Sequence, residues 1–153
     1  MKTPHLEIER KFLIREMPRG WPQFPHDEIA QGYLAAGRQT QVRLRRCGRV
    51  CSLTFKRHGK ESREEREIRL TRAQFETLWP PTAGSRLTKT RYRVPWRKWT
   101  IEIDVYSGSN TGLVVAEVEF DDLASCRAFR PPAWLGEDVT GSPRYSNIRL
   151  ARD

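Results

Sequence analysis

Long apolar runs and signal-like segments are absent from this sequence of 153 residues. No segment approaches the roughly 18 consecutive apolar residues that a membrane-spanning helix requires. Residues 1–12 also lack the apolar stretch of a signal peptide. These two absences argue against a membrane protein with a spanning helix, and they predict a cytoplasmic protein that stays where it is made.

Cysteine is scarce, with three residues at Cys47, Cys51 and Cys126. An odd number argues against a framework of disulfides. Cys47 and Cys51 are four positions apart, so they do not form the tighter C-x-x-C pair of redox or zinc motifs. We therefore expect three reduced thiols, as is typical of a cytoplasmic protein.

Acidic residues are outnumbered, since 28 Lys and Arg against 19 Asp and Glu give a formal net charge of +9. This excess favours a polyanionic partner, such as a nucleotide, polyphosphate, nucleic acid or anionic membrane surface. Aromatic residues nevertheless make up 10% of the chain, and strand-forming residues recur in clusters, which excludes a disordered basic tail. The length fits a single folded domain over residues 1–153.

Alternation of apolar and polar residues dominates the chain and predicts β-strands. The eight segments with this pattern are 5–13, 28–34, 40–46, 50–57, 64–70, 87–94, 99–106 and 114–120. Their connections are mostly too short for the crossovers that parallel strands need, so we expect antiparallel pairing.

Helical signals are fewer than strand signals. Thr71 and Gln74 form a capping-box pattern that predicts a helix, and Pro80 with its neighbouring proline ends it. A second short helix is expected to begin at Asp121 or Asp122 and to end before Pro131. The segment from 143 to the C-terminus is a third candidate.

Charged residues on the predicted strands are sorted by sign. Carboxylates occupy alternate positions, and hence one face, in four strands, at Glu7 and Glu9, Glu65 and Glu67, Glu102 and Asp104, and Glu117 and Glu119. The basic residues in comparable positions are Lys11, Arg43, Arg45, Lys56, Lys89, Arg91 and Arg93. The opposite faces are apolar, with Ile101 and Ile103 as examples.

Two interpretations of the charged faces remain open at this point. Antiparallel sheets commonly have one wet face, so the charges could simply be solvated. Like charges at alternate positions repel one another, however, unless opposite charges or a metal lie between them. Carboxylates are the oxygen ligands that Mg²⁺ and Mn²⁺ prefer, while Arg and Lys bind phosphate oxygens. The second interpretation is therefore a metal-phosphate site.

The motif "EIERK", with Glu7, Glu9 and Lys11, resembles the N-terminal signature of the CYTH superfamily, also called triphosphate tunnel metalloenzymes. The resemblance continues in order through "VRLRR", "TFK", "REEREI", "KTRYRVP", "EIDVY", "GLVVAEVEF", "PPAWLGEDVTG" and "RYSN". It implies an α+β fold, in which an eight-stranded antiparallel barrel turns its charged faces inward to form a tunnel. Helices would then cover the apolar faces outside.

The resemblance also implies roles for individual residues. The divalent metal, Mg²⁺ or Mn²⁺, would be held by Glu7, Glu9, Asp104, Glu117 and Glu119, with Glu67 and Glu102 helping at a second site. Phosphate oxygens would be bound by Lys11, Arg43, Arg45, Lys56 and Arg91, with Lys89 and Arg93 as further candidates. Lys11 could act on the nucleophilic water or the leaving group, and Tyr33 is a second candidate for proton transfer.

The function so implied is metal-dependent hydrolysis of a triphosphate, with inorganic tripolyphosphate as the favoured substrate. Alternatives are a class IV type of adenylate cyclase, or hydrolysis of thiamine or nucleoside triphosphates. Non-enzymatic alternatives are a polyphosphate-binding or nucleic-acid-binding module. The acidic pairs Glu7 with Glu9 and Glu117 with Glu119 oppose the nucleic-acid alternative, because they would repel a phosphate backbone. Membrane binding is not expected.

Overall fold

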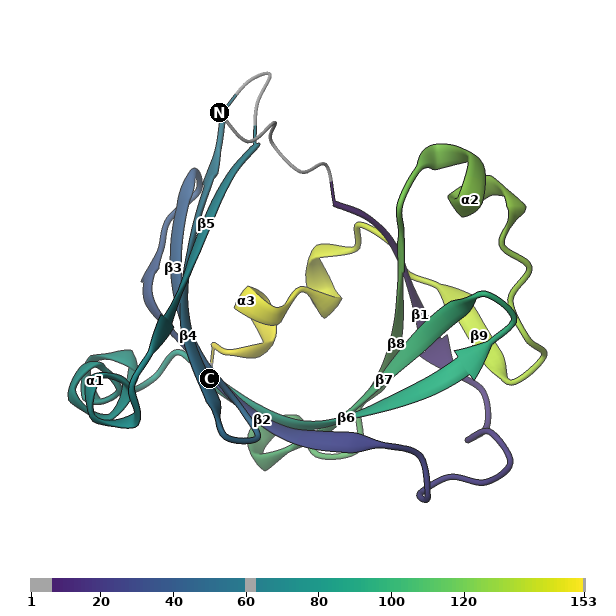
Figure 1. Cartoon of the computed structure of the whole chain (residues 1–153), viewed down its shortest axis with the longest axis horizontal. Coiled ribbons are helices and arrows are strands. Elements are labelled where there is room, and N and C mark those ends of the chain that lie inside the picture. Colours follow the sequence, from purple (N-terminus) through teal and green to yellow (C-terminus); the bar gives the residue numbers. More distant parts are fainter. Residues whose placement is uncertain (1–6, 60–62, 153) are drawn as a thin grey trace. The chain divides into compact units, whose positions relative to one another are not determined.

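The computed structural model of the protein describes residues 7–59 and 63–152. These residues form nine strands in a mostly antiparallel sheet with few helices (Figure 1). The strands are β1 (Ile8–Ile14), β2 (His26–Ala36), β3 (Thr40–Cys47), β4 (Val50–His58), β5 (Arg63–Leu70), β6 (Arg86–Trp96), β7 (Trp99–Ser107), β8 (Val114–Phe120) and β9 (Leu135–Asp138). Their hydrogen-bonded order is β5-β4-β3-β2-β6-β7-β8-β1-β9.

The chain divides into two compact units, and each is described by itself. The first unit comprises Glu28–Thr88 and the C-terminal residues from Asn147 onward. The second unit comprises Glu7–Asp27 and Lys89–Ser146. Strands β2 to β5 lie almost wholly in the first unit, and the other five lie almost wholly in the second. The single domain expected over residues 1–153 stays a prediction.

The core of the second unit is built on the apolar faces of β1, β7 and β8. Phe12, Ile101 and Val118 are almost fully buried there, as the alternation of the sequence predicts. Helix α2 (Leu123–Ala128) begins at the N-cap Asp122, whose carboxylate accepts a hydrogen bond from the backbone of Ser125. The helix contacts β1 and β8, and Figure 1 shows it beside β8. The apolar face is therefore the covered one in this unit.

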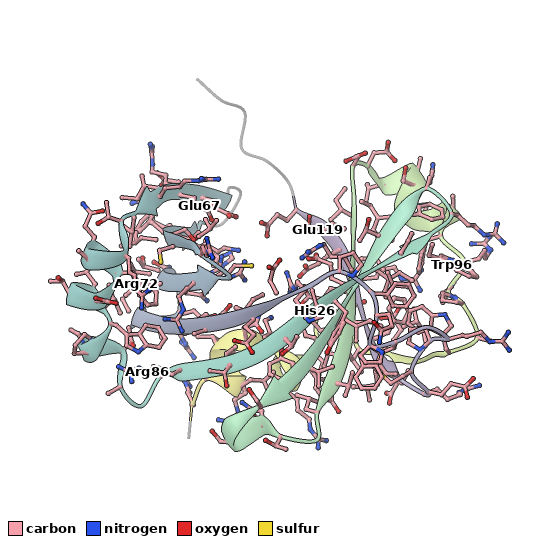
Figure 2. All side chains as sticks on the ribbon, turned by 60° about the horizontal axis from the view of Figure 1, so that its bottom comes forward. His26, Glu67, Arg72, Arg86, Trp96 and Glu119 are labelled. Atoms are coloured by element: carbon pink, nitrogen blue, oxygen red, sulfur yellow. The ribbon has the colours of Figure 1, made fainter. Side chains whose placement is uncertain are left out.

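The first unit has a smaller core between α1 (Arg72–Leu78) and the strands β3 and β4. Phe75 on the helix packs with Leu44 and Cys51, which are both buried. The predicted capping box is confirmed, because Thr71 and Gln74 exchange side chain and backbone hydrogen bonds. Figure 2 shows Arg72 at this helix and Arg86 at the start of β6.

All eight predicted strands are confirmed, except that the start of the first, at residues 5 and 6, lies outside the described residues. The ninth strand, β9, was missed because its four residues show no strand pattern of their own, and it forms by pairing with β1. The C-terminal segment forms a 3-10 turn, Pro143–Tyr145, and the short helix α3 (Asn147–Leu150). No helix in the described part of the chain is long and apolar enough to cross a bilayer.

Candidate functional site

Strand register brings charged residues together on one face of the second unit. Glu9 on β1 lies opposite Glu119 on β8, and Lys11 lies opposite Glu117. Glu117 in turn lies opposite Glu102 on β7. Directly opposed residues of antiparallel strands project from the same face, so these side chains are neighbours. Figure 2 shows Glu119 among the charged side chains of this unit.

Asp104 is the centre of a buried ion-pair network. Its two carboxylate oxygens accept hydrogen bonds from Lys89 at 2.6 Å and from Arg91 at 2.7 and 2.8 Å. The side chains of Lys89 and Asp104 are 0% and 1% exposed. Burial opposes the charge on Asp104, but Lys89 and Arg91 outweigh it and lower the pKa of Asp104 to about 2. Asp104 is therefore ionised at neutral pH.

Arg91 links this network to the other carboxylates of the face. Its guanidinium lies 3.0 Å from Glu102 and 3.5 Å from Glu117, in addition to its bonds with Asp104. A single planar cation thus reaches carboxylates on both β7 and β8. This geometry suits a residue that must hold several negative groups in fixed directions.

The other end of the face carries excess negative charge. Partial burial, with repulsion from Glu117, Glu7 and Glu119, raises the pKa of Glu9 above its ordinary value, although Lys11 opposes the shift. Partial burial also raises the pKa of Glu119, with repulsion from Glu102, Glu7 and Glu117. Both shifts mean that a cation added here would relieve repulsion. Carboxylates in this state are suited to binding a divalent metal.

Lys11 lies where the acidic end meets the network. Its ammonium is 3.1 Å from a carboxylate oxygen of Glu117 and donates a hydrogen bond of 3.0 Å to the backbone carbonyl of Tyr145. The side chain is only 12% exposed. The ammonium is thus held in one direction beside the carboxylates.

A cavity of about 340 Å³ opens beside the acidic end. Its lining includes the carboxylates of Glu102, Glu119 and Asp121, together with Lys98 and Trp99. The cavity gives solvent and solutes a way to reach two of the predicted metal ligands.

A second polar network lies on β2 to β5 in the first unit. Arg43 donates to the hydroxyl of Thr54 at 3.3 Å, and Thr54 donates to Glu67 at 2.8 Å. Arg45 donates to the side chain of Gln31, at 3.2 Å from Nε and 3.1 Å from Nη2. Neutral side chains thus help to orient both Arg43 and Arg45.

Gln31 and Thr54 are site residues that the sequence did not reveal. They are 0% and 1% exposed. Thr54 bridges Arg43 and Glu67 on the strands either side of it, and Gln31 accepts from Arg45 and donates to the Tyr33 hydroxyl. A polar uncharged residue at an alternate position carries little signal in the sequence. Their alignment with Arg43 and Arg45 across β2, β3 and β4 could have indicated them, but only with the register known.

Tyr33 lies next to Arg43 and Arg45 in the first unit. Burial raises the pKa of its phenol, although the two guanidiniums and hydrogen bonds from Gln31 and Arg43 oppose the shift. The phenol therefore stays protonated at neutral pH. This state suits a hydrogen-bond donor better than a general base.

The structure distributes the predicted site residues between the two units. The first unit holds Tyr33, Arg43, Arg45, Lys56 and Glu67, and the second holds Glu7, Glu9, Lys11, Lys89, Arg91, Arg93, Glu102, Asp104, Glu117 and Glu119. Lys56 pairs with Glu65 at 3.5 Å, and Arg93 pairs with Asp27 at 2.8 Å. Lys89 is buried against Asp104 and faces no solvent.

The described residues contain no group of three or more Asp, Glu, His or Cys arranged to hold a metal by themselves. Asp104 is paired with Lys89 and Arg91, and Glu117 is paired with Lys11. The donor chemistry still fits Mg²⁺ or Mn²⁺, because Mg²⁺ is usually bound by one or two carboxylates and completed by water and substrate phosphates. Glu9 and Glu119 lie directly opposite each other on β1 and β8 and could supply such a pair of carboxylates.

Comparisons with known proteins agree with this chemistry. A protein from Nitrosomonas europaea named inorganic triphosphatase is 42% identical over 148 residues, which cover 95% of this chain and 96% of the relative. A protein of the same name from Acetivibrio thermocellus is 31% identical, with coverage of 96% and 94%. A crystal structure of an inorganic triphosphatase is similar with a TM-score of 0.76 and 39% identity, over 100% of this chain and 97% of that chain. No protein-family model matches the chain.

Proposed function

Since the chain belongs to the inorganic triphosphatase family, within the CYTH or triphosphate tunnel metalloenzyme superfamily, we propose that it hydrolyses inorganic tripolyphosphate in a metal-dependent reaction. Membership confirms the family predicted from the sequence. The observation that carries the proposal is the charged face of the second unit. There Glu9 and Glu119 present excess negative charge, and Lys11 and Arg91 both pair with Glu117, the residue two positions before Glu119 on β8.

The metal would be held at the acidic end of this face. Glu7, Glu9, Glu117 and Glu119 are the proposed ligands, and the raised pKa values of Glu9 and Glu119 support the choice. Asp104 is so tightly paired with Lys89 and Arg91 that its proposed part is to orient those cations. Metal binding by Glu102 and Glu67 stays a prediction. A bound divalent metal would neutralise phosphate oxygens and activate the attacking water.

The basic residues would bind the phosphates. Lys11 and Arg91 are proposed to contact the phosphoryl group that is transferred, because they lie next to the acidic end. Arg43, Arg45 and Lys56 of the first unit are proposed to bind the rest of the chain of phosphates. In support, Nε of Arg43 is buried and has no hydrogen-bond partner among the described residues. A buried donor of this kind is costly unless a ligand satisfies it.

The proposed reaction needs stabilisation of charge on the phosphate oxygens rather than covalent catalysis. The Lys11 side chain lies beside Glu117 and would stabilise the charge that develops as the bond to the leaving phosphate breaks. Tyr33 would donate a hydrogen bond to a phosphate oxygen. We further propose that the strands close into the tunnel implied by the superfamily, with these charged faces lining it.

The test is release of phosphate from tripolyphosphate, thiamine triphosphate and ATP, each with Mg²⁺ or Mn²⁺. We expect the fastest release from tripolyphosphate, and loss of about a hundredfold or more in kcat for Glu9→Gln, since a ligand carboxylate is lost. Glu76→Gln is the matched control, because Glu76 is an exposed helix residue paired with Arg72. Full activity of Glu9→Gln, or turnover unaffected by EDTA, would contradict the proposal.

The same panel separates the alternatives. Cyclic AMP formed from ATP would indicate a cyclase instead, and preference for thiamine triphosphate would indicate a different substrate pocket. Tight binding of tripolyphosphate without phosphate release would indicate a polyphosphate-binding module.

A further inference from the structure

The segment after β9 wraps around Lys11 in the second unit. The backbone N–H of Val139 donates to the carbonyl of Lys11 at 2.8 Å, and the backbone N–H of Lys11 donates to the Thr140 hydroxyl at 3.0 Å. Five residues later, the carbonyl of Tyr145 accepts from the Lys11 ammonium. We name residues 138–145 the Lys11 clip, because they bind this one residue at both its backbone and its side chain.

The Thr140 hydroxyl replaces a missing strand partner. β9 ends at Asp138, so the ladder does not continue as a strand to meet the N–H of Lys11. The Thr140 hydroxyl donates a hydrogen bond to Asp138 Oδ1. The hydroxyl oxygen of Thr140 is then free to accept a hydrogen bond from the backbone N–H of Lys11. The backbone N–H of Thr140 also donates to that carboxylate at 2.9 Å. Two contacts with Asp138 therefore hold the hydroxyl in place.

Asp138 is itself fixed from β1. Arg10, the residue before Lys11, donates to Asp138 Oδ2 from Nε at 3.1 Å and from Nη2 at 2.9 Å. The Arg10 guanidinium also lies 5.0 Å from the ring centre of Phe12 and 5.7 Å from that of Phe129. The chain of contacts thus runs from the apolar core through Arg10, Asp138 and Thr140 to the backbone of Lys11.

This arrangement decides how Lys11 meets Glu117. Because both backbone polar groups of Lys11 point to the clip, Lys11 and Glu117 form a non-hydrogen-bonded pair of the β1–β8 ladder. Side chains approach each other more closely in such pairs. In this pair the Lys11 ammonium lies 3.1 Å from a carboxylate oxygen of Glu117.

From this geometry we propose that Thr140 and Asp138 are positioning residues for Lys11 in phosphate release. They act by holding the Lys11 backbone so that its ammonium faces Glu117 and the neighbouring carboxylates. The proposal rests on the proposed function, in which Lys11 contacts the transferred phosphoryl group. Asp138 bonds Arg10, whose side chain projects from the face of β1 opposite to that of Lys11.

The test compares Thr140→Val with Thr140→Ser, in the wild type and in Lys11→Met, using tripolyphosphate with Mg²⁺. We expect Thr140→Val to lower kcat about tenfold with a smaller change in KM, because a small displacement of a positioned group lowers the rate strongly. Thr140→Ser should keep kcat within about twofold of the wild type, since it retains the hydroxyl. Thr77→Val is the matched control, because the Thr77 hydroxyl donates to the carbonyl of Ala73 within α1.

The double variant separates positioning from general stability. If Thr140 acts through Lys11, Thr140→Val should change kcat less than about twofold when Lys11 is already Met, since coupled residues are not additive. An equal tenfold loss in both backgrounds, or no loss in the wild-type background, would overturn the proposal. Faster amide exchange at Lys11 in Thr140→Val is a second expected result, and unchanged exchange would also overturn it.

Two further outcomes keep the proposals distinct. If Thr140→Val does not fold, Asp138→Asn provides the same comparison, because it weakens the bonds from Arg10 and Thr140 without removing bulk. If Lys11→Met keeps full turnover, the role of Lys11 in the proposed function is wrong. The positioning roles of Thr140 and Asp138 are then wrong as well. If Lys11→Met loses turnover while Thr140→Val and Asp138→Asn keep it, the role of Lys11 stands and only the positioning roles of Thr140 and Asp138 are wrong.

Discussion

Replacing Asp104 by Asn should destabilise the protein strongly, even without any metal. Asp104 Oδ1 accepts from Arg91, and Oδ2 accepts from both Lys89 and Arg91. Whichever way an Asn amide is turned, its NH₂ group meets at least one N–H donor. The variant also leaves the buried Lys89 ammonium without its carboxylate.

Breaking a buried ion pair by removing one partner costs about 3–5 kcal/mol of unfolding free energy. We expect about 3 kcal/mol here, at the low end of that range, because Arg91 keeps Glu102 and Glu117 as partners. For a chain of this size the loss corresponds to a fall in Tm of roughly 10 °C. Urea denaturation at pH 7 in EDTA measures it, with Glu76→Gln as the exposed control.

The pH dependence should follow the same residue. The folded protein holds the pKa of Asp104 at about 2, below its ordinary value, so its contribution to stability is present above the unfolded pKa and is lost as pH falls through the folded pKa. The difference in stability between wild type and Asp104→Asn should therefore shrink between about pH 4 and pH 2. If the unfolding free energy of Asp104→Asn lies within about 1 kcal/mol of the wild-type value at pH 7, a structural role for this network is refuted. That result would favour Asp104 as a metal ligand alone.

Three further perturbations test other parts of the molecule. Gly32→Ala would place its Cβ 2.7 Å from the Thr82 hydroxyl and 3.0 Å from Trp79, so we expect a loss of about 1–3 kcal/mol by urea denaturation; an unchanged midpoint would contradict this packing. Asp122→Ala should lower Tm at pH 7, because the backbone N–H of Ser125 loses its acceptor. The hydrogen bond from Ser125 lowers the pKa of Asp122, so this difference should disappear as pH falls through that lowered pKa, and a constant difference would count against the cap. EDTA should abolish phosphate release and Mg²⁺ or Mn²⁺ should restore it, while full turnover in EDTA would exclude a required metal.

Much of the fold could be predicted because its signals are local. The eight predicted strands show apolar and polar residues in alternation, and a strand places alternate residues on opposite faces whatever it pairs with. Thr71 with Gln74, and Asp122 ahead of α2, likewise cap helices through neighbours in sequence. β9 has no such local signal, since its four residues become a strand only through contact with β1.

The candidate site was predictable by residue type but not by partner. Alternation placed Asp104 and Lys89 on charged faces, yet it could not show that they form a buried pair with Arg91 and are closed to solvent. Gln31 and Thr54 gave no signal, because the sequence does not show that these uncharged polar residues are buried.

The sequence by itself determined which residues alternate, where the two larger helices begin, and that acidic and basic groups are sorted by strand. These properties depend on neighbours a few positions apart. Only the tertiary structure decided that Lys11 meets Glu117, that Asp104 lies between two cations, and that Thr140 holds the Lys11 backbone. Those contacts join residues far apart in the chain. They depend on strand register and burial, which no local sequence pattern encodes.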